Sequence, residues 1–161
     1  IFIPTNPYPM SILTNPNRIP ENYGLRIAAG LILFFLVMFA FGLAHVVELR
    51  LLNLLILTIG VYYGLKKFRA THEASIHYFR ALATGVSIAA IGSAVFAFFL
   101  FLFLKFDTGL MEWIKENEPM GRFLNPYMAA FIVALEGVFS GLLVTFVLIN
   151  YIPTEVDNVT S

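Results

Sequence analysis

Four long apolar stretches constrain the fold of this chain more than any other feature. They cover about residues 24–47, 51–65, 79–106 and 126–151, and each contains few charged residues or none. An apolar stretch of about 20 residues is long enough to cross the hydrocarbon core of a bilayer as a helix. A soluble domain of 161 residues could not bury this much apolar surface in one core. The sequence therefore predicts an all-α membrane protein, a bundle of four transmembrane helices.

The composition agrees with this class and excludes others. Hydrophobic residues make up 59% of the chain and charged residues 12%, whereas soluble domains are about half apolar and a quarter charged. Ten basic residues balance ten acidic ones, so the basic excess typical of a nucleic-acid-binding protein is missing. Without cysteine, the chain has no disulfide, thiolate metal site or cysteine nucleophile. Residues 1–22 contain no long apolar region, so no signal peptide is expected.

The domain organisation follows from the apolar stretches and the prolines. Residues 1–23 are proline-rich and contain two Asn-Pro pairs, which predicts an extended N-terminal arm, with a loosely ordered tail as the alternative. Residues 24–152 form the transmembrane domain, and residues 153–161 form a short tail. The first two spans are separated only by "ELR", and one continuous helix would be far longer than a bilayer requires. We therefore expect the chain to reverse in a tight hairpin at residues 48–53.

A short amphipathic segment separates the third and fourth spans. Its apolar side chains Leu110, Met111, Trp113 and Ile114 would share one side of a helix. This pattern predicts a short interfacial helix with Trp113 at the depth of the lipid headgroups. An ordinary amphipathic connector would give nearly the same pattern.

Basic residues predict the orientation. Four spans place both termini and the loop at residues 66–80 on one side of the membrane. That side has Arg18, Arg26, Lys66, Lys67, Arg69 and Arg80, and the other has Arg50, Lys105, Lys115 and Arg122. Because Lys and Arg are enriched in cytoplasmic loops, we expect both termini in the cytoplasm.

Small residues predict where two of the helices pack. In the third span, Gly85, Ala89 and Ser93 belong to a series of small residues that recurs every four positions. The fourth span contains Gly137 and Gly141, a Gly-x-x-x-Gly pair. Small residues at this spacing allow helix backbones to approach closely in lipid. Phenylalanines surround the outer half of the third span, which indicates a broad face against lipid or a partner subunit.

One acidic residue, Glu136, lies inside the fourth span. It follows Pro126 by ten residues, which places it about 15 Å into the membrane. A charge at that depth costs at least a few kcal/mol on insertion scales. We therefore consider Glu136, Ser93 and Thr58 a candidate intramembrane polar site. Glu136 is either a protonatable site or polar contact to a partner, or a neutral acid hydrogen-bonded within the bundle.

Histidines do not predict a metal or cofactor site. The motif "THEASIH" separates His72 from His77 by five residues, so the two side chains would point to different sides of a helix. The remaining histidine, His45, would form a polar group with Glu48 and Arg50 at the outer hairpin. A quinone or proton-path role of His45 stays open. No catalytic residue, cofactor or metal is predicted.

Three stretches together resemble a known family. They are "ELRLLNLLILTIGVYYGLKKFR", "IHYFRALATGVSIAAIGSAVFAFF" and "FLNPYMAAFIVALEGVFSGLLVTFVLINY". In pattern and spacing they resemble a family of small four-span membrane proteins from Bacteroidota known as domain of unknown function 4199. The resemblance covers about residues 25–152. It implies a bacterial inner membrane and four helices, and it brings no known active site.

The sequence favours a non-enzymatic integral membrane protein, an accessory or structural subunit of a larger membrane protein complex. The reasons are the small-residue packing faces, the aromatic surface and the extended arm. The partners would be membrane lipids and other membrane protein subunits, with no nucleic acid. The alternative is a small oligomeric transporter or proton-coupled channel that uses Glu136. A membrane enzyme fits least, because no nucleophile–base pair or metal set is visible.

Overall fold

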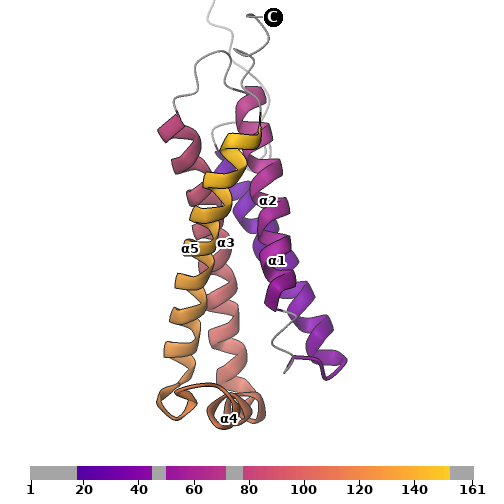
Figure 1. The fold of residues 1–161 in the computed structure, drawn as a ribbon. Helices are drawn as coiled ribbons and strands as arrows, with labels where there is room; N and C mark the ends of the chain where they lie inside the picture. The colour runs from indigo at the N-terminus through magenta and orange to yellow at the C-terminus, as the bar shows by residue number, and fades with distance from the viewer. Residues whose placement is uncertain (1–17, 45–49, 72–77, 153–161) are drawn as a thin grey trace, which may run out of the picture.

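Four long helices form the body of the protein, and a short helix lies at one end (Figure 1). The computed structural model describes residues 18–44, 50–71 and 78–152. The long helices are α1 (Ile19–Ala40), α2 (Arg50–Thr71), α3 (Tyr78–Phe106) and α5 (Pro126–Tyr151), and the short ones are α4 (Thr108–Asn117) and the 3-10 turn η3 (Gly121–Phe123). Each long helix is apolar and long enough to cross a membrane. The predicted all-α architecture with four membrane helices is confirmed.

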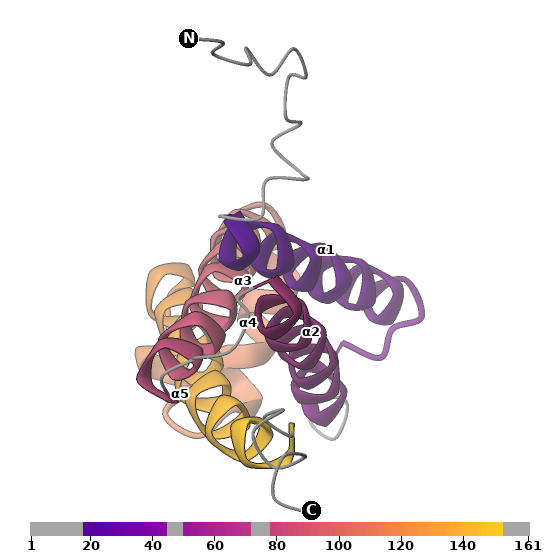
Figure 2. The same cartoon turned by 90° about the horizontal axis from the view of Figure 1, so that it is seen from above.

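Helix α3 is the centre of the bundle. It packs against α1 on one side and α5 on the other, while α2 contacts all three (Figure 2). The side chains of Ile27, Val61, Leu65 and Ile88 from α1, α2 and α3 are almost completely buried in this core. The ends of α2 and α5 and the start of α3 lie at one end of the bundle, and α4 lies at the other (Figure 1).

Helix α1 begins earlier than residue 24, where we expected the first span to start. It starts at Ile19 with Pro20 in its first turn, where the missing proline N–H costs no hydrogen bond. Ile19 is buried in the core. Residues 19–23, which we expected in the extended arm, are therefore helical. Residues 1–17 of the predicted arm and the tail at residues 153–161 lie outside the described residues.

Helix α1 also ends earlier than expected, at Ala40 instead of near residue 47. Gly42 adopts a φ of 69°, a left-handed conformation that glycine adopts without steric cost. The Gly42 N–H donates to the Phe39 carbonyl (3.0 Å) and the Leu43 N–H to the Met38 carbonyl (2.8 Å). This pair of bonds is a Schellman motif, which satisfies the last carbonyls of a helix.

The predicted hairpin at residues 48–53 is therefore wrong in its position. The chain leaves α1 at Gly42, and α2 already begins at Arg50, so Asn53 lies within a helix and not in a turn. Helix α2 continues to Thr71, six residues beyond the predicted end at residue 65. Its 22 residues span about 33 Å, enough to cross a bilayer.

Helix α4 packs its apolar side against the end of the bundle. Asp107 caps it by accepting a hydrogen bond from the Leu110 N–H (2.9 Å). Leu110 and Met111 are buried in a second core cluster with Leu104 of α3 and Ala129 of α5. Helix α5 begins with a similar cap, because the Asn125 side chain accepts a hydrogen bond from the Met128 N–H (2.8 Å). These contacts hold α4 against the end of α3 and the start of α5.

Candidate functional site

Helices α3 and α5 pack along a seam of small residues. A Cβ atom at Gly137 would lie 2.0 Å from the Ser93 hydroxyl, and one at Gly141 would lie 2.1 Å from the Ala89 Cβ. Real Cβ contacts are never this short, so only glycine fits at either position. Four of the five residues that we singled out for packing thus meet in two pairs, one helical turn apart.

The seam continues at Gly85, where the partner is a larger residue. A Cβ at Gly85 would lie 2.2 Å from the Thr145 methyl group. Thr145 is fully buried, and its hydroxyl has no hydrogen-bond partner among the described residues. The sequence pattern did not identify Thr145, because a single threonine in an apolar span is no signal of close packing.

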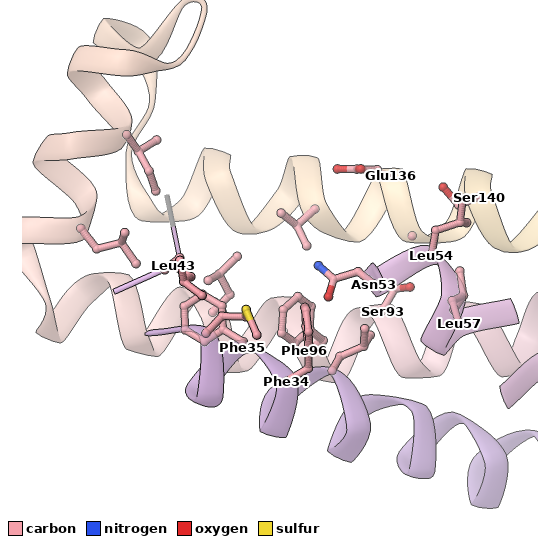
Figure 3. A pocket seen from close by; sticks show the side chains of 18 of the residues that line it. Phe34, Phe35, Leu43, Asn53, Leu54, Leu57, Ser93, Phe96, Glu136 and Ser140 are labelled. Carbon is pink, nitrogen blue, oxygen red and sulfur yellow. The ribbon is translucent and has the colours of Figure 1, made fainter. Parts of the chain in front are cut away.

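A cavity of about 190 Å³ lies beside this seam, toward α4. Side chains of α1, α2, α3 and α5 form its walls, and Leu110 and Trp113 of α4 lie at its end. Most of the lining is apolar, with aromatic rings from Phe34, Phe35 and Phe96 (Figure 3). The cavity is thus an apolar space within the part of the bundle that would lie in the membrane.

Polar side chains from three of the membrane helices line the same cavity. They are Asn53 of α2, Ser93 of α3, and Glu136 and Ser140 of α5. Figure 3 shows the Asn53 amide between α5 and α3, with Glu136 and Ser140 one turn apart on α5. The Asn53 Oδ1 atom is buried and accepts no hydrogen bond from the described residues. A buried acceptor in this state loses its hydration without compensation.

Glu136 lies at the rim of the cavity, and its side chain is exposed. The carboxylate forms no hydrogen bond or ion pair with residues 18–44, 50–71 or 78–152. Of its two predicted neighbours, Ser93 lines the same cavity and packs against Gly137, next to Glu136. Thr58 does not line the cavity, and its hydroxyl donates to the backbone carbonyl of Leu54 (2.7 Å). The structure brings Ser93 and Glu136 to one cavity but not Thr58.

Sequence reasoning missed Asn53, which we had assigned to the turn. The signal was present in the stretch "LLNLLIL", where one amide interrupts a run of apolar residues. A polar side chain inside a membrane helix usually faces the bundle or a cavity, because hydrocarbon offers it no hydrogen bond. Because α2 begins at Arg50, Asn53 lies inside a membrane helix, and the reasoning that we applied to Glu136 applies to Asn53 as well.

Arg69 is a second residue whose role the sequence did not indicate. Its guanidinium donates hydrogen bonds to the backbone carbonyls of Ile149 (3.3 Å) and Ile152 at the end of α5. The last carbonyls of a helix have no partner within the helix, so this arginine caps α5 from a neighbouring helix. Arg69 therefore ties α2 to α5 at the end of the bundle opposite α4 (Figure 1).

The remaining candidates lie largely outside the described residues. These are His45 and Glu48 of the predicted hairpin, and the "THEASIH" histidines His72 and His77. Arg50 is the first residue of α2, but its side chain is not among the described parts of the structure. Within the described part of the chain, no three histidine, aspartate or glutamate side chains gather into a possible metal site.

For the first two of its three stretches, one comparison with known proteins agrees with the resemblance seen in the sequence. No curated protein matches the chain, and no solved structure does. One protein family, described as "Protein of unknown function (DUF4199)", matches residues 22–121. The match includes most of α1, all of α2, α3 and α4, and ends before α5, so it excludes Glu136. Since it covers more than half of the chain, this membrane protein belongs to the DUF4199 family of proteins of unknown function.

Proposed function

We propose that the chain is a non-enzymatic accessory or structural subunit of a larger membrane protein complex, and that it contacts its partner beside Glu136. One observation supports this proposal most strongly. Glu136 is exposed in the middle of a membrane helix, and its carboxylate has no partner in the described parts of the chain. A charged carboxylate in lipid costs about 2.5–3.5 kcal/mol on insertion scales. A hydrogen-bond donor from another subunit would remove much of this cost.

The surface beside Glu136 supports the same proposal. Phe131, Leu135, Phe139 and Phe146 are exposed, and their spacing places them along one stripe of α5. Glu136 lies between this apolar stripe and the cavity. Membrane helices associate by van der Waals packing combined with interhelical hydrogen bonds. A partner helix that packs on the stripe could therefore place a donor side chain at Glu136.

Co-purification from native membranes tests the proposed contact. A tagged chain, extracted under mild conditions, should retain at least one other membrane protein at fixed stoichiometry. Glu136→Leu removes the acceptor and should reduce the retained partner about tenfold, the effect of a 1.4 kcal/mol loss in binding free energy. Glu136→Gln keeps an acceptor oxygen and should retain most of the partner. The measurement is quantitative mass spectrometry of the purified complex.

Ser87→Leu is a matched control for this experiment. Ser87 is also an exposed polar residue of a membrane helix, on α3, and it does not line the cavity. Its replacement should leave the retained partner unchanged. If the wild-type chain purifies alone, or if Glu136→Leu retains the partner as well as Ser87→Leu does, the proposed role of Glu136 is wrong.

A small oligomeric transporter or proton-coupled channel is the alternative, and the geometry supports it less. The polar side chains Asn53 and Glu136 lie at the cavity, toward α4. Toward the opposite end, the buried side chains of Val61, Leu65 and Ile88 fill the bundle. A path through one chain would have to cross this apolar region. Solute or proton flux in proteoliposomes that Glu136→Gln abolishes would favour the transporter over the subunit.

The orientation that we propose places both termini in the cytoplasm of a bacterial cell, with the protein in the inner membrane. The basic residues Arg18, Arg26, Lys66, Lys67 and Arg80 belong to helix ends at the side of the bundle opposite α4. A concentration of Lys and Arg near span ends favours the cytoplasmic side. Helix α4 and the mouth of the cavity would then lie toward the periplasm.

A further inference from the structure

The cavity beside α5 contains a hydrogen-bond acceptor that the described residues leave without a donor. This acceptor is Asn53 Oδ1, whose accessible surface is nearly zero. Buried polar atoms in folded proteins are nearly always hydrogen-bonded. Two other buried atoms, Thr145 Oγ1 and Arg69 Nε, also have no partner among the described residues, but neither residue lines the cavity. An additional molecule with a donor group would complete the cavity.

The shape of the bundle makes the cavity reachable from the membrane. Arg69 ties α2 to α5 at one end, and the two helices separate toward α4 (Figure 1). The cavity lies where they separate, and its lining includes exposed Leu54 of α2 and exposed Glu136 of α5. Because lining residues from both helices are exposed, a molecule dissolved in the lipid phase can enter between them.

The lining defines the chemistry of such a molecule. Its volume of about 190 Å³ exceeds that of the apolar cavity of about 150 Å³ that binds benzene in another protein. The charged side chains that line it are acidic, Glu118 and Glu136, and no Lys or Arg is among the described lining residues. A carboxylate or phosphate headgroup would therefore meet no positive charge here. The acceptor Asn53 Oδ1 instead requires a neutral donor.

We propose that this cavity binds a membrane-soluble alcohol, an apolar chain or ring with one hydroxyl group. The hydroxyl donates its hydrogen bond to Asn53 Oδ1, and the apolar part lies among Phe34, Phe35 and Phe96. Ser93 and Ser140 line the cavity, and their hydroxyl groups can donate to the oxygen atom of the bound alcohol. The proposal stands apart from the proposed partner at Glu136, because it concerns one chain alone.

Trp113 provides a direct test. It is the only tryptophan of the chain, and it lines the cavity. The full chain is reconstituted in phosphatidylcholine nanodiscs, because detergent molecules are themselves amphiphiles that could fill the cavity. Bromoundecanol should quench Trp113 fluorescence with a saturable component. Bromoundecane, which has no hydroxyl, and bromoundecanoic acid, which has a carboxylate, should quench only in proportion to their concentration in the lipid.

Two variants locate the binding site. Asn53→Leu removes the acceptor with little change in volume and should weaken saturable binding of bromoundecanol at least tenfold. Ser140→Phe adds a ring at the side of the cavity and should abolish the saturable component by occupying the space. Thr58→Val is the control on α2, because the Thr58 hydroxyl bonds its own helix and does not line the cavity. The affinity of Thr58→Val for bromoundecanol should stay within twofold of the wild-type affinity.

The outcomes separate the proposal from its alternatives. Saturable quenching by all three probes alike would show an apolar site without selectivity for a hydroxyl group and would overturn the proposal. The same holds if Asn53→Leu binds as tightly as Thr58→Val, or if wild type shows no saturable component. The comparison of three probes on the wild-type chain does not depend on how well the variants fold.

Discussion

At the scale of single residues, Arg69 shows how a charge can have a structural role that its position in the sequence hides. In the sequence it belongs to "LKKFR", a basic cluster of the kind that sets membrane orientation. In the structure its guanidinium reaches the end of α5, about 80 residues further along the chain, and donates to two backbone carbonyls. The neighbouring Lys66 and Lys67 are exposed. One residue of the cluster is thus a helix cap, whereas its neighbours face outward.

We therefore expect Arg69→Leu to destabilise the bundle more than Lys67→Leu, although both remove one positive charge. Hydrogen bonds from charged groups contribute about 1.5–3 kcal/mol each. Because Arg69 is only partly buried, a total loss of about 1–3 kcal/mol in the free energy of unfolding is expected. Lys67→Leu should change it by less than about 0.5 kcal/mol. Reversible unfolding in mixed micelles measures both, and equal losses would mean that the charge matters and not the cap.

At the scale of helices, the seam between α3 and α5 determines how closely the two can approach. Three contacts follow one another along it, Gly85 with Thr145, Ala89 with Gly141, and Ser93 with Gly137. At each level a glycine on one helix faces a larger residue on the other. One of the three glycines lies on α3 and two lie on α5, so both helices contribute to the close contact.

This matching predicts that a defect in one helix can be corrected in the other. Gly141→Ala should destabilise the protein by about 1–3 kcal/mol, because its new methyl group would overlap the Ala89 methyl group. Ala89→Gly removes that methyl group, so the double variant should recover most of the loss. A double-mutant cycle of unfolding free energies measures the coupling, which should be about 1 kcal/mol or more.

Gly30→Ala is the control for this cycle. A Cβ at Gly30 of α1 would meet only the Ile56 Cγ2 atom, at 3.3 Å, and that side chain can shift slightly. Alanine is otherwise the better helix former by about 1 kcal/mol, so this variant should be neutral or slightly more stable. If Gly141→Ala is as harmless as Gly30→Ala, or if Ala89→Gly gives no recovery, the seam is not closely packed.

The helices themselves could be predicted from the sequence, because apolarity over about 20 residues depends only on local composition. The end of α1 could not, because Gly42 lies inside an apolar run and acts only through its left-handed conformation. The candidate site was predicted in part. The depth of Glu136 follows from counting residues, but its position beside the cavity and beside Asn53 depends on how α2 and α5 are rotated and inclined. Side-chain spacing alone does not determine that arrangement.

At the scale of the whole molecule, the two ends of the bundle differ. One end has Arg69 bonded to α5, tightly buried side chains and most of the basic residues. The other has α4, the cavity and the separated parts of α2 and α5 (Figure 1). If the basic end faces the cytoplasm, the cavity opens toward the outer leaflet of the membrane. Orientation therefore decides from which leaflet a lipid-soluble ligand would enter.

Single cysteines can determine this orientation, because the chain contains no cysteine of its own. Thr71→Cys places a thiol at the end of α2, and Asn117→Cys places one at the end of α4. Both residues are exposed and uncharged, so neither change alters the Lys and Arg balance. In intact cells with a permeable outer membrane, a membrane-impermeant maleimide should label Asn117→Cys at least tenfold faster than Thr71→Cys. After the inner membrane is permeabilised, both should react alike, and the reverse preference in intact cells would place the termini and the basic end outside the cytoplasm.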